Sequence, residues 1–412
     1  AAILLVERRL GPVACPVAAC LAGLVAVGVW QIVPLPPGVL KAIAPARADL
    51  RADLLPTPRE HLTGEPATAP PPGVPLSFDP GATRAEVANL LAVLALFCVV
   101  RFGFASPASF RRLAVMCVAN AAALSVFALA QKFSSPPNVI YWTFESQGVV
   151  FGPFVCKNHF PYYTNACFGL GVGLLLPSLA RVAGARAGFL PELGRRPVVL
   201  WMLAALALLL SANLFSLSRG GLLALAGGAG AAGIVARFFA PRDHRAGSGV
   251  WVAAALVGAL GVGLVGWFGS DAVAQRLGTM GGLDALEEGR RGLWERTLPL
   301  ALRYPAWGTG FGTMPTAEPQ QRAPGAELQF VWDHAHNDYL QAFAEGGLPA
   351  LALVLIGAGL VVRAGVRAYR RFGVSRTGGG DAALALGGLL GFAAVALHSL
   401  VDFGLHIPAV VA

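Results

Sequence analysis

Residues 198–217 read VVLWMLAALALLLSANLFSL, twenty consecutive positions without a charged side chain. A helix of about 20 mostly apolar residues is long enough to cross the hydrocarbon core of a bilayer. This run therefore predicts a membrane-spanning helix. The composition of the 412 residues agrees, since 56% are hydrophobic and only 13% are charged, against about 25% charged in soluble domains.

The same length criterion finds further apolar runs along the chain. In all there are nine, near residues 12–34, 86–105, 113–132, 160–180, 198–217, 220–239, 250–268, 347–364 and 382–402. The 51 Gly and 30 Pro do not indicate disorder, because disordered chains have low hydrophobicity. Glycine is common in membrane helices, where it allows close packing. We predict an all-α fold, a polytopic transmembrane bundle forming a single domain over residues 1–412 that was cut from a longer protein.

The distribution of basic residues predicts the orientation of these spans in the membrane. Seventeen of the 31 Lys and Arg, with only four acidic residues, fall in one alternating set of segments between the spans. The other set holds the remaining fourteen, with eighteen acidic residues. The positive-inside rule places the first set in the cytoplasm. The net charge of +9 is thus a topology signal and does not indicate a nucleic-acid partner.

Two outer segments are long. Residues 35–85 form a Pro-rich loop with an amphipathic stretch near Val39–Leu55, and residues 269–346 form the largest loop, with helical patterning over 284–303. Long loops that carry their own structure are often functional, so chemistry is expected there. The short cytoplasmic loops contain no nucleotide-binding glycine motif, and no CxxC pair suggests a metal site or disulfide framework.

The densest polar cluster, residues 333–339, reads DHAHNDY and is followed by Glu345. Two His and two carboxylates within six positions could bind zinc, but a His–His spacing of two fits no common helical zinc motif. A solvated polar turn before a helix is another reading. We favour a catalytic or orienting histidine, His336, because a neutral imidazole can accept a proton from a hydroxyl near neutral pH.

A lone arginine separates two apolar runs at the outer boundary, in Ser216-Leu-Ser-Arg219-Gly-Gly221. A boundary arginine often only snorkels to the interface. Here, however, two glycines open the next helix, so its exposed N–H groups and its dipole lie beside a fixed cation. That combination suits a phosphate group.

The outer loop carries two adjacent arginines in residues 287–296, EEGRRGLWER. On a helix, Arg290 and Trp294 share a face at i, i+4. A charged solvent-exposed helix is the alternative, but arginine can also make a bidentate contact to phosphate. The spacing to Trp294 favours Arg290 over Arg291 as the phosphate ligand, while leaving both open.

Two further polar stretches border spans. Lys157, Asn158 and His159 open a span on the outer side, where an interfacial loop with an aromatic anchor and a substrate-lining role are equally compatible with the sequence. His398, Asp402 and His406 follow at spacings of four near the end of the last span. Polar residues in membrane helices usually face inward and are paired, so we interpret these three as structural support.

Taken in this order, these stretches resemble the O-antigen ligase family. The resemblance runs from about residue 34 to the C-terminus and is strongest over 150–350. It is carried by residues 218–220, 290–294, 305–312, 336–340 with Glu345, and 398–408. The adjacent Arg290 and Arg291 depart from the family pattern, which has one arginine there. Family members usually have about twelve spans, which agrees with a chain cut from a longer protein.

The resemblance implies a glycosyltransferase in the bacterial inner membrane, with its active site facing the periplasm. Such enzymes move a glycan from undecaprenyl pyrophosphate to an acceptor hydroxyl, with no nucleotide, metal or other cofactor. The acceptor is lipid A–core for a ligase, a growing polysaccharide for a polymerase, or a protein side chain for an O-oligosaccharyltransferase. A membrane transporter and a non-catalytic scaffold are the remaining alternatives, although few acidic residues lie within the spans, as an ion-coupled carrier would need.

The family's functional residues carry over by position. Arg219 and Arg290 are expected to hold the pyrophosphate, and His336 is expected to activate or orient the acceptor. The expected substrate-contacting residues are Lys157, Asn158, His159, Arg291, Trp294, Asn337, Asp338 and Glu345.

Overall fold

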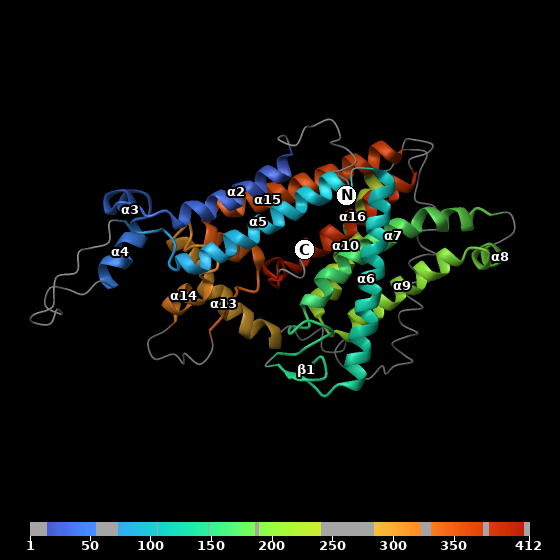
Figure 1. The fold of residues 1–412 in the computed structure, drawn as a ribbon, viewed down its shortest axis with the longest axis horizontal. Helices are drawn as coiled ribbons and strands as arrows, with labels where there is room; N and C mark the ends of the chain where they lie inside the picture. The colour runs from blue at the N-terminus through green and yellow to red at the C-terminus, as the bar shows by residue number, and fades with distance from the viewer. Residues whose placement is uncertain are drawn as a thin grey trace, which may run out of the picture. The chain divides into compact units, whose positions relative to one another are not determined.

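The computed structural model describes residues 15–54, 73–104, 106–146, 148–185, 189–239, 284–322, 331–373 and 379–407. Most of this part of the chain is α-helical (Figure 1). Seven helices are long and apolar enough to cross a membrane: α5 (Pro80–Gly103), α6 (Pro107–Ser134), α7 (His159–Ala183), α9 (Pro197–Phe215), α10 (Arg219–Phe239), α15 (Asp338–Gly373) and α16 (Gly379–His398). The predicted all-α, polytopic helical bundle is confirmed.

Seven of the nine predicted spans coincide with these helices. The first, predicted at 12–34, contains α2 (Pro16–Ile32), an apolar helix of 17 residues that is shorter than the other seven. The span predicted at 250–268 lies outside the described residues. The span predicted at 347–364 is part of the much longer α15, which begins at Asp338.

Short elements connect the long helices. The amphipathic stretch near Val39–Leu55 forms two helices, and the patterning over 284–303 is confirmed as a helix of the same bounds. A two-stranded antiparallel hairpin pairs Val139 with Glu145 and Ile140 with Phe144. The short elements are α3 (Pro37–Ile43), α4 (Pro45–Leu54), β1 (Val139–Ile140), β2 (Phe144–Glu145), α8 (Phe189–Gly194), α13 (Asp284–Arg303), α14 (Met314–Ala317), and the 3-10 turns η3 (Glu318–Gln321) and η4 (Gly404–His406).

The chain groups into two compact units. Unit 1 comprises residues 1–15, 99–283 and 359–412, and unit 2 comprises residues 16–98 and 284–358. Helices α5 and α15 each begin in unit 2 and end in unit 1. Each unit has its own buried hydrophobic clusters.

Glycines bring the helices of unit 1 into close contact. A Cβ added at Gly169 of α7 would lie 2.4 Å from the carbonyl oxygen of Gly387 on α16, and one added at Gly228 of α10 would lie 2.6 Å from that of Leu390. Membrane helices pack by such small residues because lipid offers no hydrophobic driving force between them. The high glycine content therefore reflects helix packing.

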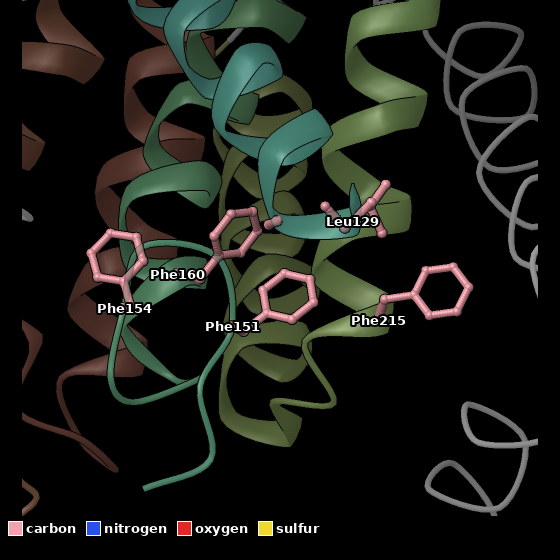
Figure 2. Packing of buried hydrophobic residues seen from close by; sticks show 7 residues of the cluster. Leu129, Phe151, Phe154, Phe160 and Phe215 are labelled. Atoms are coloured by element: carbon pink, nitrogen blue, oxygen red, sulfur yellow. The ribbon is translucent and has the colours of Figure 1, made fainter. Parts of the chain in front are cut away.

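In unit 1, an aromatic cluster lies at the start of α7. Phe151 and Phe160 meet edge to face with ring centroids 4.9 Å apart, and Phe154 packs on the other side of Phe160 at 6.3 Å. Figure 2 shows these rings with Leu129 of α6 and Phe215 of α9. The aromatic anchor that the sequence suggested for this loop is present, and it fixes the position at which α7 begins.

In unit 2, α2, α5 and α15 pack around Phe311, which forms a cluster with Val27, Leu90 and Ala350. Gly347 lies within α15 at φ 68° and ψ −168°, so α15 consists of two helical segments joined by a kink. A Cβ at Gly347 would lie 2.8 Å from the backbone of Ala306. The loop after α13 therefore approaches α15 closely at a point where only glycine fits.

Candidate functional site

In unit 1, Arg219 is the first residue of α10 and is only 8% exposed. Leu217 has a positive φ of 55°, which turns the chain sharply between α9 and α10. The Ser218 hydroxyl accepts a hydrogen bond from the Gly221 N–H at 3.2 Å, as an N-terminal cap does. Arginine is almost never this deeply buried without a partner or role, so a snorkelling side chain at the membrane boundary does not describe Arg219.

Side-chain amides fix the first turn of α10. Asn165 of α7 donates to the Gly221 carbonyl at 2.9 Å, and Asn213 of α9 donates to the Asn165 oxygen at 2.8 Å. Thr164 donates in turn to the Asn213 oxygen at 2.8 Å. The three side chains are at most 1% exposed, so the network joins α7, α9 and α10 in the interior of unit 1 and orients the helix start that bears Arg219.

The two polar stretches bordering spans lie near the same helix start. His398 of α16 stacks on Tyr162 of α7, with ring centroids 4.0 Å apart. A Cβ at Gly220 would lie 3.2 Å from His398 Nε2. His159, which is 4% exposed, meets the ring of Phe403 edge-on at 4.8 Å. The start of α7, the start of α10 and the end of α16 thus converge.

The remaining residues of these stretches differ in exposure. Lys157 and Asn158 are half-buried just before α7. Asp402 is fully buried, and His406 lies half-buried in η4. Buried positions for His398 and Asp402 agree with the structural role that the sequence suggested for them.

In unit 2, the adjacent arginines Arg290 and Arg291 of α13 differ in exposure. Leu293, Thr297 and Leu300 form its buried face. Arg291 is exposed and pairs with Glu295, with 2.9 Å between Nε and Oε1. Arg290 is half-buried and lies one helical turn before Trp294.

Trp294 connects α13 to the histidine segment. Its indole N–H donates to the Ala335 carbonyl at 2.9 Å. The face of α13 that carries Trp294, and with it Arg290, is therefore the one that meets the chain beside His336.

His336 lies in a strained turn before α15. Its φ is 50°, a left-handed conformation that is uncommon for a residue with a side chain and that concentrates at functional sites. The Asn337 side chain caps α15 by accepting from the N–H groups of Tyr339 and Leu340, at 3.1 Å and 3.0 Å. The half-buried His336 ring meets Trp332 edge-on at 5.7 Å. The backbone on both sides is held while the imidazole stays partly accessible.

Gln341 supports the same turn. Its amide oxygen accepts from the Ala335 N–H at 3.0 Å, and its amide nitrogen lies 3.1 Å from His334 Nδ1. Asp338 is 4% exposed in the first turn of α15, where a carboxylate complements the helix dipole.

Glu345 holds the glycine-rich loop after α13. Its two carboxylate oxygens accept from the N–H groups of Gly312 and Met314, both at 3.0 Å. Gly308 has φ 68°, and a Cβ there would lie 2.3 Å from the Glu345 backbone. Gln31 of α2 donates to the Glu345 carbonyl at 2.7 Å. Because the Glu345 carboxylate is engaged and 1% exposed, the predicted substrate contact through it remains a prediction.

The sequence did not single out Asn165, Asn213 or Gln31. Each is a polar amide inside or at the end of an apolar run. Such residues are unusual within membrane helices and usually face the interior, which is the signal that could have identified them. The zinc alternative gains no support, because in the described ranges no three His, Cys, Asp or Glu side chains lie close enough to hold a metal ion.

These features define a class: a multi-pass membrane protein with a buried arginine at a helix start and a histidine in a strained turn. Residues 204–355 match the family model described as O-antigen ligase, which confirms the family that the sequence resembles. The match runs from α9 into α15 and includes Arg219, Arg290 and His336. No curated protein matches the chain. This match supports a membrane glycosyltransferase over a transporter or scaffold.

Proposed function

We propose that the protein transfers a glycan from undecaprenyl pyrophosphate to an acceptor hydroxyl at the periplasmic face of the bacterial inner membrane. The observation that carries the proposal is the burial of Arg219 at the start of α10, within the region that matches the O-antigen ligase family. A buried cation at a helix start, where the helix dipole is positive, suits a pyrophosphate group.

The two arginines would stabilise the leaving group. When the bond between the anomeric carbon and the phosphate oxygen breaks, its electron pair leaves with the pyrophosphate. Arg219 and Arg290 would offset that charge electrostatically without a metal. Arg290 is preferred to Arg291 because Arg291 is exposed and already paired with Glu295. Lys157, Asn158 and His159 at the start of α7 would line the donor side.

His336 would act on the acceptor. The acceptor oxygen forms a new bond to the anomeric carbon and gives its proton to the imidazole, which later releases it to water. The strained turn presents the imidazole, while Trp294 and Asn337 hold the surrounding backbone and Asp338 lies in the first turn of α15. No nucleotide, metal or other cofactor is required in this scheme, because the arginines supply the positive charge.

The acceptor decides between members of the family. Lipid A–core, a growing polysaccharide and a protein side chain each offer a hydroxyl. A strain lacking the protein would show which one applies. Uncapped core despite normal lipid-linked polymer indicates a ligase, whereas core capped by a single repeat indicates a polymerase. Normal lipopolysaccharide with an unglycosylated protein indicates an oligosaccharyltransferase.

The reaction itself is tested with purified protein in liposomes. The donor is a glycan on undecaprenyl pyrophosphate, and the control donor is the same glycan on a nucleoside diphosphate. We expect transfer from the lipid donor alone, undiminished by excess chelator. Passage of the donor or glycan across the membrane without chemical change would instead support a transporter.

A further inference from the structure

Arg47 on α4 is a half-buried arginine of unit 2 with few partners. Its Nη2 donates to the Ser77 carbonyl at 3.3 Å, and its guanidinium carbon lies 4.5 Å from the centre of the Phe78 ring. Its Nε is buried without a hydrogen-bond partner among the described residues. Burial lowers the pKa of Arg47 by desolvating the charged form.

Tyr304, just after α13, lies against the same phenylalanine. Its ring meets Phe78 edge to face, with centroids 5.2 Å apart. Tyr304 is 5% exposed, and within the described ranges its hydroxyl has no hydrogen-bond partner. Arg47 and Tyr304 thus contact the same ring, and they interact electrostatically.

The two groups require the same kind of ligand. Among the described residues, no carboxylate pairs with the Arg47 guanidinium. Burying this charge without a counter-ion costs free energy. The buried Tyr304 hydroxyl also lacks a hydrogen-bond acceptor among the described residues, which costs further free energy. Water could satisfy the hydroxyl, but only an anionic oxygen satisfies the hydroxyl and also neutralises the cation.

We infer that Arg47 and Tyr304, which have no part in the proposed reaction, form a binding site for a phosphate or carboxylate group. The group is carried either by an acidic or phosphorylated sugar, such as an acceptor would present, or by an anionic lipid head group. Arg47 supplies the charge and Tyr304 donates one hydrogen bond. The idea that a bound sugar is the acceptor rests on the proposed function. Binding of the anionic group itself does not depend on glycan transfer.

Direct binding to the purified chain tests the inference. The soluble probes are glucose 6-phosphate and unphosphorylated glucose, with affinity measured by microscale thermophoresis. We expect the phosphorylated sugar alone to bind, and Arg47→Gln and Tyr304→Phe each to weaken its binding at least tenfold. Arg84→Gln is the matched control, because Arg84 is an exposed arginine of unit 2 at the start of α5 and removes the same charge.

The lipid source is tested in nanodiscs with and without phosphatidylglycerol, by native mass spectrometry of co-purified lipid. Loss of retained phosphatidylglycerol in both variants assigns the site to a head group and upholds it. Tyr304→Phe keeps the ring, so it remains informative if Arg47→Gln fails to fold. The inference is overturned if the wild type binds none of the probes, if both variants bind as the wild type does, or if Arg84→Gln loses as much. Since no readout depends on glycan transfer, these outcomes are distinct from failure of the proposed reaction.

Discussion

The polar clusters of the two units are built in opposite ways. Arg219 lies at the start of a regular helix, buried among amides and close-packed glycines. His336 lies on irregular backbone with a positive φ, half-buried beside a glycine-rich loop. A cation that stabilises a leaving group must be fixed and desolvated, whereas a group that exchanges protons must be reached by acceptor and water. The contrast matches the roles proposed for the two residues.

The largest expected effect separates these roles directly. Arg219→Ala is expected to lower transfer about 10²–10³-fold, the cost of removing one group that stabilises developing charge. It should also weaken donor binding, since in the proposed mechanism the arginine contacts the pyrophosphate before the bond breaks. His336→Ala is expected to lower kcat about 10²–10⁴-fold, the usual contribution of a general base, and to leave donor affinity unchanged. Initial rates at several donor concentrations measure both.

Arg195→Gln serves as the control, because Arg195 is exposed and borders α9 at its other end. It should transfer as the wild type does. If Arg219→Ala and His336→Ala also transfer at the wild-type rate, the assignment of both residues is wrong.

The second prediction concerns the adjacent arginines of α13. Arg290→Gln is expected to lower transfer about 10–100-fold, since a hydrogen bond to a charged group contributes about 1.5–3 kcal/mol. Arg291→Gln should change it little, because an exposed ion pair such as the one with Glu295 contributes little. Both variants remove one charge from one helix, so each is the control for the other. A larger loss from Arg291→Gln would reverse the preference.

The third prediction tests whether the buried amides position Arg219. Asn213→Leu keeps the approximate volume but takes the donor from the Asn165 side-chain oxygen, and it removes one of the two acceptors of the Thr164 hydroxyl. We expect the free energy of unfolding to fall by about 1–3 kcal/mol, the cost of a buried unsatisfied polar group. The apparent KM for the donor should rise, because Asn165, which bonds to the start of α10, is oriented less firmly. Thermal unfolding and donor titration measure the two effects.

Asn120→Leu is the matched control for this change. Asn120 is also an asparagine in a long helix, α6, but it is exposed and donates to Tyr163. It should leave the donor KM unaltered. An equal rise in KM in both variants would show that Asn213 acts through general stability and not through Arg219.

Short-range sequence patterns predicted the helices of both units and several positions of the candidate site residues on them. Apolar runs of sufficient length identified seven helices, and the i, i+4 spacing of Arg290 and Trp294 placed them on one face of α13. These features depend on residues close in sequence, so helical periodicity determines them. The position of Arg219 at a helix start followed in the same way from Gly220 and Gly221.

Long-range packing produced what the sequence did not reveal. The Asn165–Asn213 hydrogen bond joins residues 48 positions apart and exists only once α7 and α9 are packed. The Glu345 carboxylate likewise accepts from the N–H groups of Gly312 and Met314, which lie 33 and 31 positions earlier in the chain. A polar residue in an apolar run signals that a partner exists, but the partner's identity requires the tertiary structure.

The smallest expected effect distinguishes a supporting role for Glu345 from the substrate contact that the sequence predicted. Glu345→Gln keeps the shape and one acceptor oxygen, so one of the two loop N–H groups stays bonded and the other loses its partner. We expect a loss of about 1 kcal/mol in the free energy of unfolding and a fall in transfer of less than about tenfold. Glu345→Ala, which removes both acceptors, should destabilise the protein more. If Glu345→Gln instead abolished transfer as His336→Ala does, at unchanged thermal stability, the carboxylate would act on the substrate, and the glycine-rich loop would serve to position it.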